Sequence, residues 1–258
     1  MMKRQNHKSA GKPVFLDGRT GHEIGVDLED IMHFRFQFTR GEDLKFIGHL
    51  DILRLFERVF KRSGLPVAHS QGFNPRPQII FGQPMPLGLT SEGEFADVEL
   101  IGKHDPQEFL KTMNDALPPG IRVVDAKEKK NPSNLMGQIS GARYRVGFKA
   151  PEGFRLQQLI DDVLAADTLL VMKKTKSGDK EKNIRPFIYE LTGTLNASGA
   201  CFEVLLGAGQ DDNIRPDLFL SGVSAAFQAD LELISMHRII LLGRRENNWL
   251  SLLDEQML

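Results

Sequence analysis

The chain has 258 residues, of which 41% are hydrophobic and 26% are charged. This composition is ordinary for a globular protein, and the length allows two compact domains of about 100 residues each. The formal net charge of −1 excludes the strongly basic balance of a dedicated DNA-binding protein. Any contact with nucleic acid therefore has to come from a local basic patch.

Cys201 is the single cysteine, and it stands in an apolar run typical of a buried strand. One thiol cannot form an internal disulfide or ligate an iron–sulfur cluster, so we expect the chain to hold no cofactor. No apolar run reaches the roughly 18 residues of a membrane span, and the polar start of the chain lacks the core of a signal peptide. We therefore expect a cytoplasmic protein without a membrane partner.

Residues 1–30 show no sustained hydrophobic period, and they are predicted to form a flexible extension. Beyond them, Phe34, Phe36 and Phe38 alternate with polar residues, which indicates a half-buried strand. The following residues predict, in chain order, a helix over 49–63, strands over 79–81 and 95–100, a helix over 105–117 and a strand over 121–126.

This order of elements is the ferredoxin-like, or split βαβ, arrangement. Further strands and helices follow in a similar order, with strands at 143–148, 169–173, 187–195, 202–206 and 235–242 and helices at 156–166 and 216–227. We predict an α+β fold with two tandem ferredoxin-like domains, the second more divergent. The predicted parts are domain 1 over 31–127, a polar linker over 128–141, domain 2 over 142–245 and a C-terminal tail over 246–258.

A distinctive run follows the first predicted helix: Ser70, Gln71, Gly72, Phe73, Asn74, Pro75, Arg76 and Pro77. Together with residues 49–51, 84–88 and 91–94, it resembles the signature of the radical-SAM-linked proteins of bacteria. Members of that family are similar to a C-terminal domain of radical SAM proteins or to a small protein encoded beside one. The resemblance spans about residues 33–240 and is strongest over 33–100. It implies a radical SAM enzyme as a partner, and it implies no particular reaction.

The first candidate binding surface is the basic face of the helix over 49–63, formed by Arg54, Arg58, Lys61 and Arg62. Such a face can bind the phosphates of RNA, or it can simply be the solvated side of an amphipathic helix. The residues favour neither alternative. We expect no acidic residue on this face to offset the four charges, since Glu57 lies toward the side of the helix.

The second candidate is the loop over 69–77, which gathers hydrogen-bonding side chains on a backbone stiffened by two prolines. These side chains belong to His69, Ser70, Gln71, Asn74 and Arg76. In the alternative interpretation, the loop is a structural turn that satisfies its own backbone while Phe73 packs into the core. We favour binding, because the donors and acceptors exceed what one turn needs.

The third candidate is a lysine-rich stretch that includes Lys173, Lys174 and Lys176 and is predicted to be the tip of a hairpin. A solvated loop is its ordinary explanation, and an electrostatic grip on RNA is the alternative.

For catalysis, only His49 and His69 are candidates, as general acid or base in RNA cleavage. Our leading hypothesis is a non-catalytic accessory or substrate-binding partner of a radical SAM enzyme, with RNA as the first substrate class. The alternative is a metal-independent RNA endonuclease. A tandem ferredoxin-like arrangement also resembles CRISPR repeat-processing endonucleases, at the level of fold only.

Overall fold

The structure is a computed structural model. It describes residues 14–16, 23–25, 30–71, 73–131, 133–175, 178–196, 199–209 and 213–258. Most of the predicted extension over 1–30 lies outside these ranges. Its described part is a pair of antiparallel strands, β1 (Val14–Leu16) and β2 (Glu23–Gly25).

The first half of the chain forms an antiparallel sheet covered by two helices. Its elements are β3 (Ile31–Arg40), the short helix η2 (Glu42–Leu44), α1 (His49–Ser63), β4 (Ile79–Phe81), β5 (Leu89–Ile101), α2 (Pro106–Ala116) and β6 (Ile121–Glu128). The strands lie in the order β6-β3-β5-β4. The alternating phenylalanines of β3 are buried under the helices, where Phe34 stacks on Phe109 of α2 at 5.1 Å between ring centroids.

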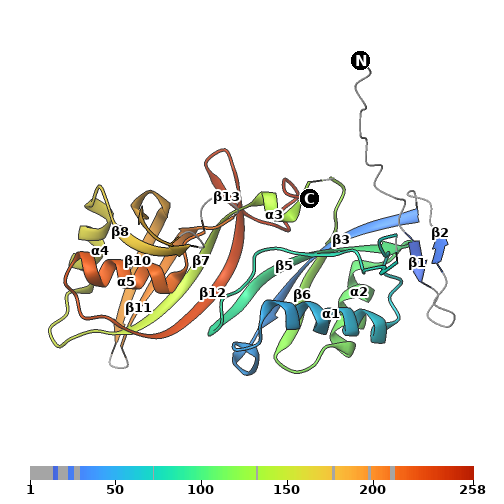
Figure 1. Cartoon of the computed structure of the whole chain (residues 1–258), viewed down its shortest axis with the longest axis horizontal. Helices are drawn as coiled ribbons and strands as arrows, with labels where there is room; N and C mark the ends of the chain where they lie inside the picture. Colours follow the sequence, from blue (N-terminus) through green and yellow to red (C-terminus); the bar gives the residue numbers. More distant parts are fainter. Residues whose placement is uncertain are drawn as a thin grey trace, which may run out of the picture.

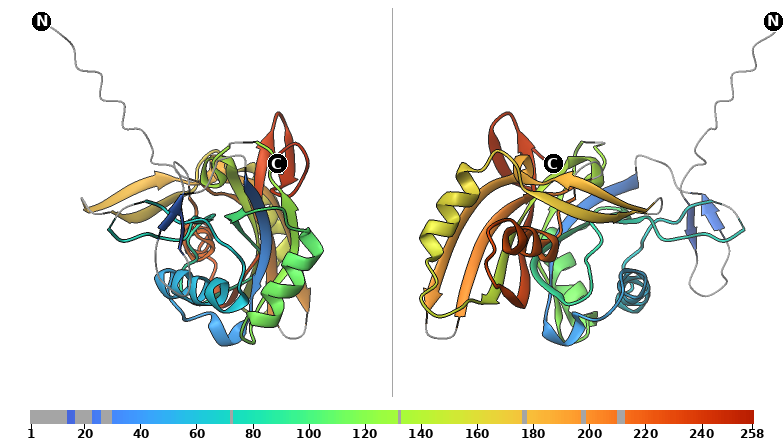
Figure 2. Two further views of the ribbon diagram at one scale, coloured as in Figure 1. Left: turned by 90° about the vertical axis from the view of Figure 1, so that its right-hand side faces the viewer. Right: turned by 60° about the vertical axis from the view of Figure 1, so that its left-hand side comes forward.

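The second half also consists of antiparallel strands and helices, and it carries a separate hairpin. Its elements are β7 (Ile139–Lys149), α4 (Leu156–Ala165), β8 (Leu170–Thr175), β9 (Gly178–Asn183), the short helix η3 (Arg185–Phe187), β10 (Ile188–Asn196), β11 (Gly199–Gly207), α5 (Pro216–Ala226) and β12 (Glu232–Arg245). The strands lie in the order β10-β11-β7-β12, and β8 and β9 form a separate hairpin. Figure 2 shows this hairpin, in yellow to orange, extending away from the body of the molecule.

One nine-stranded mixed sheet runs through both halves, because β12 pairs in parallel with the start of β5. Figure 1 shows the halves side by side with β12 and β5 at their junction. The prediction of a mixed α+β fold is confirmed. The two halves do not form separate sheets, however, because β5 is long enough to pair with β12 at its start and with β4 further along.

The four main helices, α1, α2, α4 and α5, lie on one side of this sheet. Glu94 of β5 lies opposite Phe38, so it points to the face that α1 and α2 cover. It pairs there with Arg238 of β12, which also contacts Tyr144 in the core beneath α4 and α5. The other face, named here the open face, carries charged residues such as Arg143, Arg145 and Glu203.

Two predicted segments differ from the structure. The range 128–141, predicted as a linker, contains the end of β6, the helical turn α3 (Leu135–Gln138) and the start of β7. The range 246–258, predicted as a tail, contains β13 (Asn248–Ser251), which pairs with β12. After β13, Leu252, Leu253 and Met257 are buried, so this segment is part of the core.

The C-terminal segment is held by polar groups from the first half. The guanidinium of Arg35 donates to the carbonyls of Leu252 and Met257, at 3.2 and 3.3 Å. The same group forms a bidentate pair with Asp97, at 2.6 and 2.9 Å. Figure 1 shows the C-terminus beside α3, near the junction of the halves.

Among the described residues, no helix has the length and apolar character needed to cross a membrane.

Candidate functional site

A groove of about 700 Å³ opens where the first half meets β12. It is named here the junction groove. Its lining residues are Thr39, Arg40, Gly41, Glu42, Thr90, Ser91, Glu92, Asn114, Leu117, Pro118, Pro119, Gly120, Ile121, Arg122 and His237. One end is therefore polar, where β5 and β12 meet, and the other is formed by the apolar turn that leads from α2 into β6.

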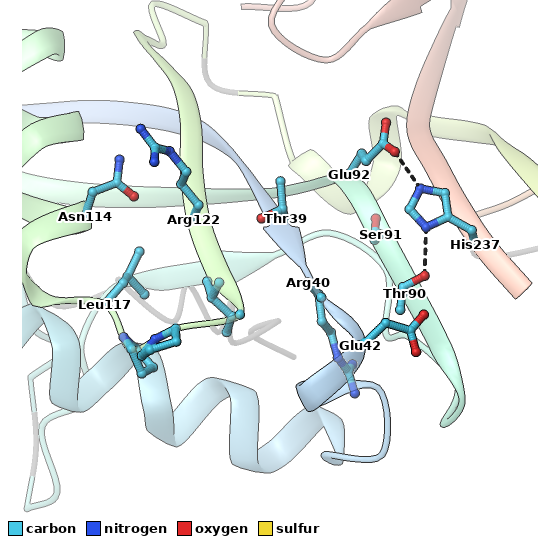
Figure 3. Close-up of a pocket in the computed structure, with 15 residues that line it drawn as sticks. Thr39, Arg40, Glu42, Thr90, Ser91, Glu92, Asn114, Leu117, Arg122 and His237 are labelled. Carbon is cyan, nitrogen blue, oxygen red and sulfur yellow. Dashed lines mark hydrogen bonds and ion pairs between the residues drawn. The ribbon is translucent and has the colours of Figure 1, made fainter.

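His237 is the centre of the polar end. It lies opposite Thr90 in the parallel pairing of β12 with β5. Its Nδ1 is 2.7 Å from the Thr90 hydroxyl, and its Nε2 is 3.0 Å from a carboxylate oxygen of Glu92. Figure 3 shows the imidazole held between these two groups. An ionised carboxylate only accepts hydrogen bonds. The Nε2–H group of His237 therefore donates the hydrogen bond to Glu92.

A buried ion pair beside His237 fixes β12 against β5. The Arg238 guanidinium donates to both carboxylate oxygens of Glu94, at 2.8 and 2.9 Å, and lies within 3.3 Å of the Tyr144 hydroxyl. Burial by itself lowers the pKa of Arg238, but the Glu94 carboxylate and Tyr144 outweigh it, so the pKa lies above its ordinary value. Arg238 is therefore charged, and the strand that carries His237 is held in one register.

Only part of the lining of the groove is available to a ligand. The Thr90 hydroxyl is nearly buried, and the described residues contain no cluster of side chains suited to a metal ion. Arg40 lines the groove, but its guanidinium donates to the carbonyls of Leu44 and Ile47. Burial lowers the pKa of Arg40. The exposed side chains at the rim include Glu42, Glu92 and Arg122.

The basic helix face is less basic than its sequence indicated. Arg54 forms an ion pair with Asp51 one turn earlier, at 3.1 Å, which corrects the prediction that no acid offsets this face. Arg62 donates to the carbonyl of Ala116 at the end of α2, so it has a structural role. Arg58 and Lys61 remain exposed and have no ion pair to a described residue. Two cations rather than four are thus available on α1.

The loop over 69–77 is closed by its own backbone. Ser70 N–H donates to the Arg76 carbonyl at 2.9 Å, and Arg76 N–H donates to the Ser70 hydroxyl at 3.0 Å. His69 and Pro77 form a β-bridge at the base of the loop. Ser70 therefore serves the loop itself, as the alternative interpretation expected.

The tip of the same loop points outward. Phe73 is fully exposed, so the alternative interpretation, in which it packs into the core, is wrong on this point. Gln71, Asn74 and Arg76 are exposed beside it. Gly72 lies outside the described residues.

The predicted lysine hairpin is formed by β8 and β9. Lys173 is partly buried, and its ammonium lies 3.5 Å from the Asn213 carbonyl. Lys174 belongs to β8 but its side chain is not among those described, and Lys176 lies outside the described residues. Two apolar side chains on β8, Leu170 and Met172, are exposed.

His49 and His69 are not brought together in one site. His49 starts α1, and it lines a separate small cavity with Phe81, Gln83 and other residues. His69 Nδ1–H donates to the Val67 carbonyl at 2.9 Å. Burial lowers the pKa of both imidazoles. Among the described residues, neither imidazole is hydrogen-bonded to a side chain that could act with it.

Sequence reasoning missed His237 and Glu92. His237 stood alone in the pattern, because the residues that contact it are about 145 positions away in the chain. A signal was available for Glu92, since it belongs to the acidic stretch over 91–94 that contributed to the family resemblance.

The sequence profile of one family, described as "Uncharacterized protein conserved in bacteria (DUF2344)", matches residues 33–216. No curated protein matches the chain.

Two solved structures give weak matches. A chain of a Cbf5-Nop10-Gar1 complex is similar with a TM-score of 0.44 and 8% identity, over 91% of this chain and 54% of that one. This chain thus spans about half the length of that relative. An unknown protein from Galdieria sulphuraria is similar with a TM-score of 0.24 and 15% identity, over 79% of this chain and 99% of that one. Both TM-scores are too low to identify a shared fold.

Proposed function

The chain belongs to the bacterial family of uncharacterized proteins DUF2344, and we propose that it is a non-catalytic accessory protein of a radical SAM enzyme. In this role it works in the cytoplasm and binds the enzyme, the macromolecular substrate, or both. RNA is the substrate class that we propose first. The sequence run over 70–77 supports the enzyme partner through its resemblance to the radical-SAM-linked proteins.

The observation that carries this proposal is Phe73 on its closed loop. Burying a phenylalanine side chain is worth about 1.5–3 kcal/mol relative to leaving it in water, and nothing in the described structure covers this ring. Two hydrogen bonds, from Ser70 N–H to the Arg76 carbonyl and from Arg76 N–H to the Ser70 hydroxyl, fix the base of the loop before any partner arrives. An ordered loop that presents an exposed aromatic side chain pays little conformational entropy on binding. It is therefore suited to insertion into a pocket of a partner protein.

We also interpret each half of the sheet as a ferredoxin-like unit. In both halves the first strand of the unit lies between its last and its third strand, as the orders β6-β3-β5-β4 and β12-β7-β11-β10 describe. This is the neighbour order of a split βαβ unit. Because α1, α2, α4 and α5 lie on one side, none of them covers the open face of the second half.

Capture of the partner enzyme by surface variants tests the proposal. The tagged protein is expressed in its native cell, and the iron–sulfur protein that co-purifies is identified. We expect the wild-type protein to capture a radical SAM enzyme and Phe73→Ser to lose most of that capture. Leu195→Ser is the matched control, because Leu195 is an exposed apolar residue on β10, in the other half.

Equal capture by Phe73→Ser and the wild-type protein would show that the loop is not part of the interface. Failure of the wild-type protein to capture any radical SAM enzyme would overturn the proposed partner.

A further inference from the structure

Three side chains from three strands meet on the open face of the second half. Trp249 of β13 and Tyr189 of β10 have ring centroids 4.8 Å apart, with their planes inclined at 49°. The guanidinium carbon of Arg244, on β12, lies 5.2 Å from the Trp249 centroid and 5.7 Å from the Tyr189 centroid. This group is named here the aromatic cluster.

The sheet beneath is shaped to receive the indole. A Cβ atom at Gly141 of β7 would lie 2.6 Å from the Trp249 ring and 3.3 Å from Leu205. Gly141 alternates with Ala142 and Tyr144, which face the core, so its free side is the open face that also carries Arg143. The indole therefore packs closely against β7 at Gly141, where a side chain would displace it. Both aromatic rings remain partly exposed.

The positive charge over the rings belongs to Arg244, and no described carboxylate neutralises it. Arg244 and Arg245 are exposed, and neither forms an ion pair with a described carboxylate. By contrast, the neighbouring Arg143 is held by Glu190 at 2.7 Å. A guanidinium stacked on aromatic rings, without an acidic partner, is free to meet an anionic ligand.

We propose that the aromatic cluster is a stacking site for the unpaired bases of a single-stranded nucleic acid. Exposed aromatic rings on a sheet bind unpaired bases by stacking, and an arginine beside them contributes both stacking and contact with phosphate. Such a site tolerates any base, because every base has a flat π-surface. An acidic protein surface would use the arginines but would leave the rings without a role.

This inference deepens the proposed function and rests on it, since it assigns the nucleic-acid substrate to a defined part of the open face. The surface differs from the basic face of α1 that the sequence indicated. The two surfaces can therefore be separated by mutation.

Tryptophan fluorescence tests the site directly, because Trp249 is the only tryptophan in the chain. The full-length protein is titrated with oligouridylate and, in parallel, with oligothymidylate of the same length. We expect saturable quenching that weakens with added salt, since phosphate contacts release counterions. Comparing the two oligonucleotides shows whether the ribose hydroxyl contributes.

Variants then separate stacking from simple charge attraction, with binding measured by the anisotropy of a labelled oligonucleotide. Loss of one stacking contact is worth about 1–3 kcal/mol, so we expect Tyr189→Leu to weaken binding by about tenfold. Arg244→Gln, at an exposed position, is expected to weaken it by several fold. Arg155→Gln is the matched control, because Arg155 is an exposed arginine before α4, away from this face, and we expect unchanged affinity.

Three results would overturn the site: no quenching by either oligonucleotide, equal quenching by inorganic polyphosphate or by an acidic peptide, and unchanged affinity of both Tyr189→Leu and Arg244→Gln. A loss of affinity in Arg58→Gln alone would assign the nucleic acid to α1 instead. If the titration fails while the protein still captures a radical SAM enzyme, the stacking site is wrong and the accessory function stands.

Discussion

Arg238 and Glu94 are the residues that couple the two halves most directly. Both are almost completely buried, and each comes from a different half. Removing one member of a buried ion pair leaves the other charge without compensation, which costs about 3–5 kcal/mol. We therefore expect Arg238→Met or Glu94→Leu alone to lower the free energy of unfolding by this amount, measured in urea. The double variant should lose less than the sum of the two, and strict additivity would contradict direct coupling.

His49 and His69 give the stability a defined dependence on pH. Burial lowers the pKa of both side chains in the folded protein, so the unfolded chain binds more protons below its ordinary histidine pKa of about 6.5. The free energy of unfolding should therefore fall as the pH drops below that value. Urea titrations of a His49→Asn/His69→Asn variant should show a shallower fall than the wild-type protein. An identical slope would mean that neither imidazole is protonated on unfolding.

At the scale of elements, the close packing of β5 against β12 depends on Gly93. A Cβ atom at this position would lie 2.6 Å from the Ile239 carbonyl oxygen and 2.6 Å from the Ile240 Cα atom. Both contacts are with the neighbouring strand rather than with a flexible side-chain end, so the strands must move apart. We expect Gly93→Ala to lower the free energy of unfolding by about 1–3 kcal/mol. Gly137→Ala is the control, because a Cβ atom at Gly137 would have its nearest contact at 4.0 Å. Comparable losses of unfolding free energy in the two variants would argue against crowding at Gly93.

The elements with clear hydrophobic periods could be predicted from the sequence. The alternation of Phe34, Phe36 and Phe38 defined β3, and the helical spacing over 49–63 defined α1, because both elements bury one face. The start of β5 was not predicted, because it lacks a clear alternation of apolar and polar residues. Its buried positions include Ser91 and Glu94, and a buried acid is recognised only once its partner Arg238, 144 residues later, is known.

The candidate site was predicted only in part, for a related reason. The loop over 69–77 and its exposed donors follow from local sequence, and the structure places them at the surface. The ion pair between Arg54 and Asp51 could also be predicted from the local sequence, since the two residues are three positions apart on one helix. The groups around His237 and Trp249 come from strands far apart in the chain. Their proximity depends on the sheet order, which no local pattern shows.

At the scale of the whole molecule, the two halves behave as one structural unit. They share a continuous sheet, and the C-terminal segment of the second half is bound by Arg35 of the first. The four main helices, α1, α2, α4 and α5, lie on one side of this sheet. The accessory role that we propose assigns the loop at Phe73 and the open face of the second half to two separate contacts.

The most direct test of the accessory role is purification of the tagged protein from its native cell, with and without ribonuclease. The proteins and nucleic acids that co-purify are identified in both conditions. We predict that a radical SAM enzyme is recovered in both, and that RNA is recovered only without ribonuclease. Recovery of RNA with no radical SAM enzyme, together with cleavage of that RNA by the purified protein in the presence of a chelator, would contradict the account and favour an endonuclease.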